Sequence, residues 1–249
     1  MLEGKTAVVY GAGTISGAVA EAFAREGARV FVASRGAERL AALAERIRAA
    51  GGQVEAAQLD ALDERAVDEH ADEVVRRAGS LEVSFSAINH NDVQGKPMWE
   101  MSLEDFEAPV ITGLRTSFIT WRAATRHMIK QGGGVIISFG GEGPPLRDWY
   151  LGGLQAGLDV IETMRRQLAT EAGKHGVRVV TMRTGGVPEG IPDDFPAKAK
   201  IEESIVGQTL LGRAATREDV GNVAAFIASD RARTMTAATV NVSCGALID

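Results

Sequence analysis

Short apolar runs rich in valine and isoleucine alternate along this chain with longer amphipathic segments. The runs predicted to be strands are residues 6–9, 30–33, 54–58, 83–88, 135–139, 178–182 and 239–242. The segments with apolar residues at helical spacing are residues 18–26, 37–50, 64–77, 103–130, 154–174 and 217–228. This alternation is typical of strand-helix-strand units, whose strands are buried on both faces of a parallel sheet. The pattern predicts an α/β fold with a doubly wound, seven-stranded parallel sheet flanked by helices.

Length and apolar content favour a single domain over residues 1–249. A chain of 249 residues with 45% hydrophobic content can bury a large core. One segment, residues 187–211, breaks the strand-helix rhythm with three prolines and mixed charge. We predict that this segment is a mobile lid over a substrate site.

Charge and residue usage exclude several classes of function. The net charge of −6 is scattered, so no basic face is available for nucleic acid. No apolar run approaches the roughly 18 to 20 residues that span a bilayer, and we expect a cytoplasmic protein without a membrane partner. The single cysteine, Cys244, excludes an intramolecular disulfide and a thiolate metal cluster. The four histidines have no metal-ligand spacing, so no metal is expected.

A glycine-rich turn follows the first predicted strand and leads into a helix. It reads Gly11-Ala12-Gly13-Thr14-Ile15-Ser16-Gly17. Glycine lets the backbone turn sharply and approach a pyrophosphate, whose charge the helix N-terminus attracts. We therefore predict a Rossmann fold that binds a dinucleotide through Gly11, Gly13, Thr14 and Ile15. The alternative is an ordinary turn between a strand and a helix.

The ends of the next two predicted strands indicate which dinucleotide is bound. Ser34 and Arg35 follow the second strand, where an acidic residue would instead hold a ribose 2′-hydroxyl. Both can bind a 2′-phosphate, so NADP is favoured, with NAD left open and a solvated arginine as the alternative. Asp60 and Ala61 follow the third strand, where the carboxylate can accept a hydrogen bond from adenine. Asp60 could equally be the N-cap of the following helix.

These features resemble the short-chain dehydrogenase/reductase family over essentially the whole chain. The remaining segments that carry the resemblance are Gly212-Arg213, Glu218-Asp219-Val220, Ala228-Ser229-Asp230 and Gly245. The resemblance implies further cofactor contacts from Asn89, Gly185 and Val187. Ile15 replaces a family glycine, and the family's cofactor-binding threonine matches Glu189, whose charge would be unfavourable beside a pyrophosphate.

The resemblance also implies a catalytic set of serine, tyrosine, lysine and asparagine, of which only part is present. Tyr150 stands at the tyrosine position, while Leu154 replaces the lysine and Gly113 the asparagine. An ungapped match puts Gly140 at the serine position, and a short gap brings Ser138 there. Without the lysine, a tyrosine stays protonated near pH 7 and is a poor base, although it can still donate a proton. The alternatives are that Tyr150 caps a helix and that Ser138 is a buried strand serine.

Other residues could replace the missing groups. His90, Asn91 and Asp92 follow the fourth strand, at the sheet edge where ligands bind in this architecture. Glu142 and Asp148 flank the loop before Tyr150. A histidine that titrates near neutral pH is the natural substitute acid or base, whereas His127 and His175 are expected to be structural.

The leading hypothesis is an NADP-dependent oxidoreductase that acts on a small carbonyl or alcohol, with Tyr150 donating the proton and Ser138 assisting. Ile191, Phe195 and Ile201 in the predicted lid suggest an apolar substrate. One alternative is non-redox chemistry in the same pocket, such as cyclisation, isomerisation or dehydration. Another is a catalytically silent partner subunit.

A homo-oligomer, either a tetramer or a dimer, is also expected. The resemblance implies assembly through helices 103–130 and 154–174. The apolar run of Leu151, Leu154, Leu158 and Ile161 suits such packing.

Overall fold

The computed structural model describes residues 1–140 and 149–248 of the chain. Its strands are β1 (Thr6–Tyr10), β2 (Arg29–Ser34), β3 (Gln53–Gln58), β4 (Val83–Ser86), β5 (Gly134–Phe139), β6 (Val177–Arg183) and β7 (Thr239–Asn241). Its α-helices are α1 (Thr14–Arg25), α2 (Ala37–Ala49), α3 (Glu64–Ala78), α4 (Leu103–Gln131), α5 (Gly152–Ala172), α6 (Lys198–Gly207) and α7 (Arg217–Ala228). Short 3-10 helices are η1 (Met98–Glu100), η2 (Gly173–His175), η3 (Pro188–Gly190) and η4 (Asp230–Ala232).

All seven strands pair in parallel, in the order β3-β2-β1-β4-β5-β6-β7. The chain first winds outward from β1 to β3, then returns to the other side of β1 and winds outward again to β7. The order therefore reverses between β1 and β4, the point at which doubly wound sheets leave a crevice at their carboxyl edge. The predicted fold class is confirmed.

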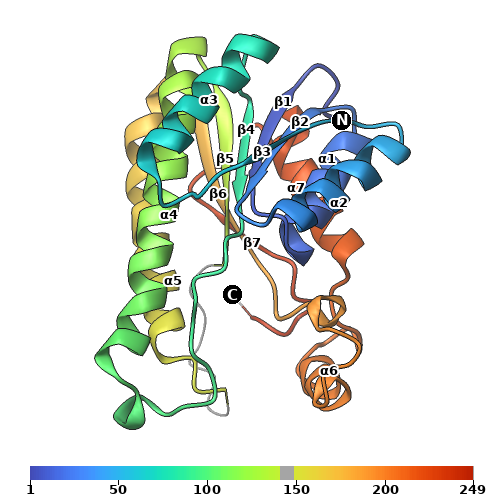
Figure 1. Cartoon of the computed structure of the whole chain (residues 1–249), viewed down its shortest axis with the longest axis vertical. Helices are drawn as coiled ribbons and strands as arrows, with labels where there is room; N and C mark the ends of the chain where they lie inside the picture. Colours follow the sequence, from blue (N-terminus) through green and yellow to red (C-terminus); the bar gives the residue numbers. More distant parts are fainter. Residues whose placement is uncertain (141–148, 249) are drawn as a thin grey trace.

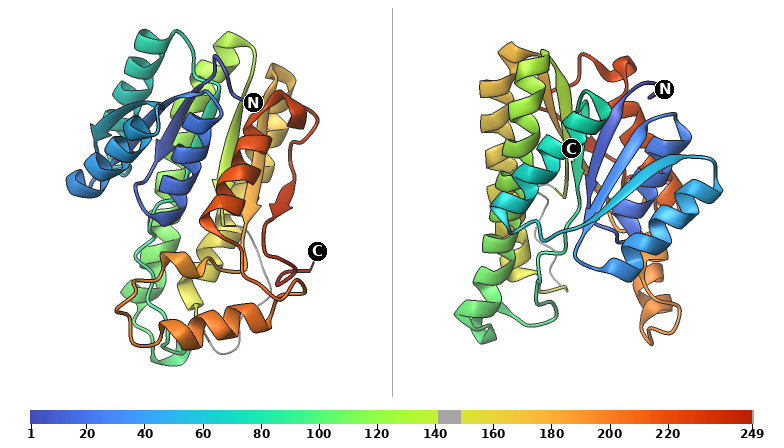
Figure 2. Two further views of the ribbon diagram at one scale, coloured as in Figure 1. Left: turned by 90° about the vertical axis from the view of Figure 1, so that its right-hand side faces the viewer. Right: turned by 45° about the horizontal axis from the view of Figure 1, so that its top comes forward.

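Two layers of helices cover the sheet (Figure 1). Helices α1, α2 and α7 pack on one face, and α3, α4 and α5 pack on the other, as the two views of Figure 2 also show. Each face has its own apolar cluster, because alternate side chains of a strand point to opposite faces. On β5, for example, Ile137 joins the α1 side and Ile136 joins the α4 side.

The boundaries differ from the sequence prediction at three places that bear on the site. Helix α1 begins at Thr14 rather than at residue 18, so the second half of the glycine-rich turn is the first turn of the helix. Strand β4 ends at Ser86 rather than at residue 88, opposite the ends of its neighbours β1 and β5. Helix α6 lies inside the predicted lid, where the prolines argued against a helix but precede it.

Close contact with α4 positions the start of α5. A Cβ atom at Gly153 would collide with the backbone carbonyl of Phe106, and one at Gly157 would lie 3.1 Å from the carbonyl oxygen of Pro109. Glycine at these positions lets the two helix backbones approach each other. This close approach fixes the positions of the α5 side chains that lie at the carboxyl edge of the sheet. None of the helices in the described part of the chain is both long and apolar enough to cross a membrane.

A buried charge cluster joins α5 to the sheet. Glu162 and Arg165, both nearly inaccessible to solvent, form an ion pair one turn apart on α5. The Thr181 hydroxyl on β6 donates a hydrogen bond of 2.6 Å to the Glu162 carboxylate. Removing one partner from such a pair leaves a buried charge without compensation.

Replacing Glu162 with alanine should therefore destabilise the protein by about 3 kcal/mol or more, because Arg165 would remain buried without its carboxylate. Chemical denaturation followed by circular dichroism measures this change. Glu171→Ala, at an exposed position on the same helix, is the control and should cost little. Equal effects of the two substitutions would contradict the assignment.

Candidate functional site

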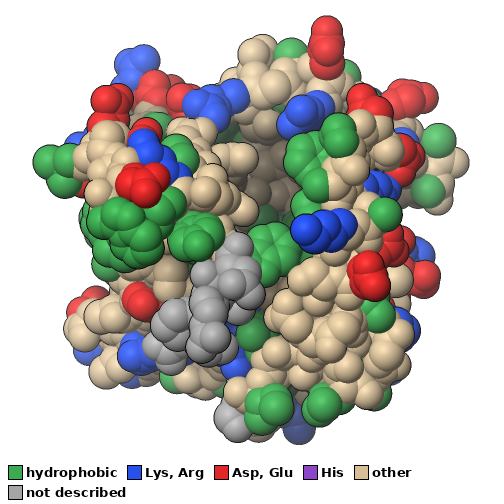
Figure 3. Space-filling view, turned by 90° about the horizontal axis from the view of Figure 1, so that it is seen from below, with side chains coloured by type: hydrophobic (Ala, Val, Ile, Leu, Met, Phe, Trp, Pro, Cys, Tyr) green, Lys and Arg blue, Asp and Glu red, His purple; other side chains and the backbone are tan. Residues whose placement is uncertain are grey.

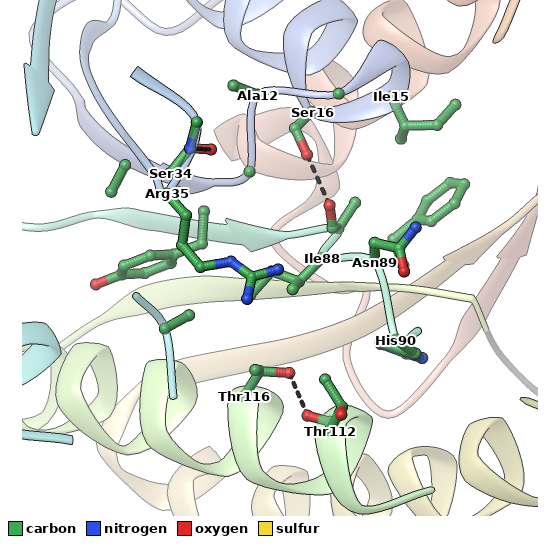
Figure 4. A pocket seen from close by; sticks show the side chains of 18 of the residues that line it. Ala12, Ile15, Ser16, Ser34, Arg35, Ile88, Asn89, His90, Thr112 and Thr116 are labelled. Atoms are coloured by element: carbon green, nitrogen blue, oxygen red, sulfur yellow. Dashed lines mark hydrogen bonds between the residues drawn. The ribbon is translucent and has the colours of Figure 1, made fainter. Parts of the chain in front are cut away.

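A cleft of about 1010 Å³ opens at the carboxyl edge of the sheet, above the ends of β1 and β4. Figure 3 looks onto this edge and shows the hollow between the two helix layers. The glycine-rich turn, the end of β2 and the start of α2 form one wall. The segment after β4 and side chains from α4 and α5 form the other. Figure 4 shows how these side chains face one another.

The glycine-rich turn is held against the end of β4. The Ser16 hydroxyl donates a hydrogen bond of 3.0 Å to the carbonyl of Ala87, drawn as a dashed line in Figure 4. Gly11 has a φ of +118°, and a Cβ atom there would collide with the Ser16 side chain and lie 2.7 Å from the Ala87 carbonyl. The predicted need for glycine at position 11 therefore has a physical cause. Gly13 is the N-cap of α1 and provides no side-chain cap, so the positive end of this helix faces the cleft.

A second helix without a side-chain cap begins at the other end of the cleft. Helix α2 starts after Gly36, directly beyond Ser34 and Arg35. Arg35 points into the cleft in Figure 4, with one guanidinium nitrogen 3.9 Å from a carboxylate oxygen of Asp60. Arg39 and Glu38, in the first turn of α2, also line the cleft. This end combines two arginines and a helix N-terminus with two carboxylates.

Asp60 does not cap the following helix. Its carboxylate accepts a hydrogen bond of 3.0 Å from the backbone N–H of Leu62, whereas Asp63 is the N-cap of α3. The N-cap alternative for Asp60 is therefore wrong. Asp60 and Ala61 both line the cleft beside the end of β2. Contact with an adenine remains a prediction for both residues.

The segment after β6 meets the cleft at a different residue than expected. Gly190 lines the cleft and lies against Thr14, while neither Gly185 nor Val187 is among its described lining residues. Gly185 packs against Ser243 and Ala246 instead. The Glu189 carboxylate accepts a hydrogen bond of 2.6 Å from the N–H of Arg217, the first residue of α7. The negative charge of Glu189 was expected to be unfavourable beside a pyrophosphate. It is instead bound to the N-terminus of α7.

The two predicted catalytic side chains are not brought together around the cleft. Ser138 is buried within β5, in register with Ser86 and Thr181, and does not line the cleft. Tyr150 is 44% exposed, with a φ of +49°, and is also absent from the lining residues. It precedes Leu151, the N-cap of α5, so it does not cap that helix. Catalytic roles for Tyr150 and Ser138 stay predictions, and the candidates Glu142 and Asp148 lie outside the described residues.

Leucines from α5 make the inner end of the cleft apolar. Leu154 and Leu158 both line it, and Ile161 is buried in the core one turn further along the helix. These residues were expected to suit packing between subunits, but the structure turns them inward. A Cβ atom at Gly140, at the end of β5, would lie 2.6 Å from a methyl group of Leu158. Leu158 therefore occupies the space that a side chain at position 140 would need.

His90 occupies the space that a side chain at position 113 of α4 would need. A Cβ atom at Gly113 would lie 3.0 Å from Cε1 and 3.1 Å from Nδ1 of His90, and 2.9 Å from Ile161. Figure 4 shows the imidazole next to Thr112 on the same helix. Burial lowers the pKa of His90 below its ordinary value of 6.5, and the nearby Asp92 carboxylate opposes this shift. The uncharged imidazole is therefore the form present near neutral pH.

Sequence reasoning found most of the outer wall, and on the inner side it named His90, Asn91 and Asp92, which all line the cleft. The predicted cofactor-binding residues that line the cleft are Gly11, Gly13, Thr14, Ile15, Ser34, Arg35, Asp60, Ala61 and Asn89, and cofactor binding by them stays a prediction. Arg39 was missed, although its position one helical turn after Arg35 could have indicated it. The contact between His90 and Gly113 was also missed, since nothing in the sequence links residues so far apart. Within the described residues, no cluster of histidine, cysteine or carboxylate side chains could hold a metal.

Comparison with known proteins identifies the family. A family model described as enoyl-(acyl carrier protein) reductase matches residues 11–246. The chain belongs to the short-chain dehydrogenase/reductase family. Members of this oxidoreductase family generally use NAD(P).

Individual relatives align over nearly the whole chain. A short-chain dehydrogenase/reductase from Armillaria gallica is 31% identical over 99% of this chain and 97% of its own. A 3-oxoacyl-[acyl-carrier-protein] reductase from Thermotoga maritima is 27% identical over 99% of both chains. The crystal structure of a short-chain type dehydrogenase/reductase from Mycobacterium marinum superposes with a TM-score of 0.86 at 24% identity, covering 98% of this chain and 96% of that one.

The packing of His90 against Gly113 can be tested by a double-mutant cycle. Gly113→Ala should destabilise the protein by about 1–3 kcal/mol, because the new methyl group displaces the imidazole. In a His90→Ala background the same change should cost less, because only the contact with Ile161 then opposes the new methyl group and alanine is preferred over glycine within a helix. Thermal unfolding of the four proteins gives the coupling. Additive effects would show that the two positions are not in contact.

Proposed function

We propose that the protein is an NADP-dependent oxidoreductase that acts on a small, apolar carbonyl or alcohol. The observation that carries the proposal is that two helix N-termini without side-chain caps, those of α1 and α2, begin at one cleft, with Arg35 and Arg39 beside the second. Side chains cap α3, α4 and α7. Helices α5 and α6 also lack a side-chain cap, but their N-cap residues, Leu151 and Ala197, are not among the described lining residues of the cleft. Free helix N-termini at a cleft attract anions.

The described residues fit an extended dinucleotide. Gly11, which has no room for a side chain, and the N–H groups of the first turn of α1 would hold the pyrophosphate. Ser34, Arg35 and Arg39 would hold a 2′-phosphate, against repulsion from Glu38 and Asp60. The bound nicotinamide would supply hydride transfer, with its ribose passing Asn89. Family membership supports a nicotinamide cofactor, and the arginines support its phosphorylated form.

An apolar inner end favours an apolar substrate. Leu154, Leu158 and Phe139 line this end, and a charged substrate would lose its hydration there without a described opposite charge. We propose that the segment 187–211, with η3 and α6, covers the substrate as a lid, bringing Ile191, Phe195 and Ile201 close to it. Lid closure would exclude water from the reacting groups.

Cofactor binding provides the first test. The protein should bind NADPH more tightly than NADH, as measured by quenching of tryptophan fluorescence. Arg35→Ala should weaken NADPH binding about tenfold or more, because one charge-assisted hydrogen bond to the phosphate is lost, and should leave NADH binding unchanged. Arg65→Ala, an exposed arginine on α3, is the matched control. Equal loss of both cofactors would argue against a 2′-phosphate contact, and no binding of either would refute the proposed oxidoreductase.

Turnover of a candidate substrate provides the second test of the proposed function. NADPH absorbance should fall when small apolar ketones such as cyclohexanone are added. Chemical conversion of substrate with no change in NADPH absorbance would favour the non-redox alternative. Binding without any conversion across such a panel would favour the silent subunit.

We also propose that the protein assembles into a homo-oligomer through α4. Ile111, Leu114 and Phe118 share one face of this helix and are all exposed in the single chain, which favours burial against a second copy. Phe118→Glu should shift the wild-type oligomer to a smaller species in light scattering coupled to gel filtration. A monomeric wild-type protein would contradict the proposal.

A further inference from the structure

The inner end of the cleft contains one side chain suited to proton transfer among its described residues. His90 extends from the loop after β4 and packs against α4, and it lines the cleft with Leu154 and Leu158. Within the described part of the chain, neither ring nitrogen of His90 has a hydrogen-bond partner. The Nδ1–Cε1 edge of the ring faces Gly113. Nε2 is therefore the nitrogen further from the helix.

Neighbouring polar groups are already engaged or lie elsewhere. The Thr116 hydroxyl donates a hydrogen bond of 2.8 Å to the Thr112 carbonyl on its own helix. Arg35 and Arg39, the cationic side chains among the described lining residues, belong to the end of the cleft beside β2. Tyr150, predicted to carry the proton, is not a lining residue. On the loop of His90, the Asn89 side-chain oxygen accepts a hydrogen bond from the N–H of Asn91, and the Asp92 carboxylate accepts one from Gln94. Among the described lining residues, His90 is the side chain that packs against apolar residues of α4 and α5 and has a ring nitrogen available for a substrate.

We propose that Nε2 of His90 takes the hydroxyl proton of a small apolar alcohol as it is oxidised in this cleft, and returns it when the carbonyl is reduced. This inference rests on the proposed oxidoreductase function and deepens it. It assigns the proton transfer to a residue on the β4 loop in place of Tyr150.

The step balances with the cofactor proposed above. As the alcohol is oxidised, its O–H bond breaks and the proton passes to the imidazole, while the carbon–oxygen double bond forms. NADP⁺, when bound, takes the electron pair of the C–H bond as hydride. The imidazolium is stabilised by the Asp92 carboxylate and then releases its proton to solvent.

The surroundings set the protonation state that this role needs. On α4 and α5, His90 lies beside Gly113, where Ile161 also packs, and beside Thr112, and none of these residues titrates. The residues of α4 and α5 among the described cleft lining are Thr112, Thr116, Leu154 and Leu158, which do not titrate either. Asp92, on the loop of His90 itself, is the charged group that acts on it. Since burial outweighs this carboxylate, the pKa of the imidazole is lowered and the base is free to accept a proton at pH 7.

The decisive variant is His90→Gln, which keeps polarity but cannot titrate near neutral pH. We expect kcat/KM for oxidation of cyclohexanol with NADP⁺ to fall about a hundredfold or more, the usual contribution of a general base. Binding of NADPH should be unchanged. His175→Gln, exposed on η2 at the other edge of the sheet, is the matched control and should behave as wild type.

The pH profile separates this role from a structural one. With His90 as the base, the acid limb of the pH profile of wild-type kcat/KM for oxidation should have its midpoint below the ordinary histidine pKa of 6.5, with no further rise in alkaline solution. A tyrosine base without a lysine would instead make the rate rise toward about pH 10. Full activity of His90→Gln, together with loss of activity in Tyr150→Phe or an alkaline limb, would overturn the inference.

A titration of the His90 signal tests the proposed role of His90 without enzyme turnover. In protein with ¹³C-labelled histidine, the His90 signal, assigned from its loss in His90→Gln, should titrate below pH 6.5 and shift on addition of cyclohexanol. An unshifted signal would overturn the inference even if no alcohol is oxidised. Failure of the proposed function is distinct, because neither NADPH nor NADH would then quench the tryptophans.

Discussion

The hydrogen bond from Ser16 to the Ala87 carbonyl ties the first turn of α1 to the end of β4, and the cleft depends on it. These elements lie on either side of the point where the strand order reverses, and there the chain leaves the paired strands β1 and β4 toward helices on opposite faces of the sheet. The contact is close enough to require glycine at position 11. It leaves the N–H groups of α1 directed into the open crevice, where an anion can reach them.

Two glycines at the inner end of the cleft each lie against a side chain from another element. Glycines stand at the two positions that resemble the family's asparagine and, without a gap, its serine, and in each case another side chain fills the vacated space. His90 lies against Gly113, and Leu158 lies against Gly140. Glycine within a helix costs up to about 1 kcal/mol relative to alanine, so its presence in α4 is explained by the imidazole beside it. With Leu154 at the position that resembles the family's lysine, the lining of this end is apolar, and burial there keeps His90 uncharged near neutral pH.

Much of the fold and the outer wall could be predicted, because the signals were local. Buried parallel strands read as continuous apolar runs, and the residues that follow them must meet at one edge. Asp60 shows where prediction from local sequence stops, because an aspartate two residues after a strand can either line a cleft or cap a helix. Its hydrogen bond with the N–H of Leu62 decides between the two. Leu154 and Leu158 show the same limit of prediction, because an apolar helix face can pack against a neighbouring subunit or line a cleft.

The sequence by itself determined the parallel sheet, the glycine-rich turn and the arginine beside a helix N-terminus, because each follows from residues adjacent in the chain. Only the tertiary structure decided which side chains surround the inner end of the cleft. The packing of α4 against α5 through Gly153 brings Leu154 inward, and the loop after β4 carries His90 onto Gly113. Such contacts depend on how helices and loops from distant parts of the chain pack together, and a local sequence pattern does not predict that packing.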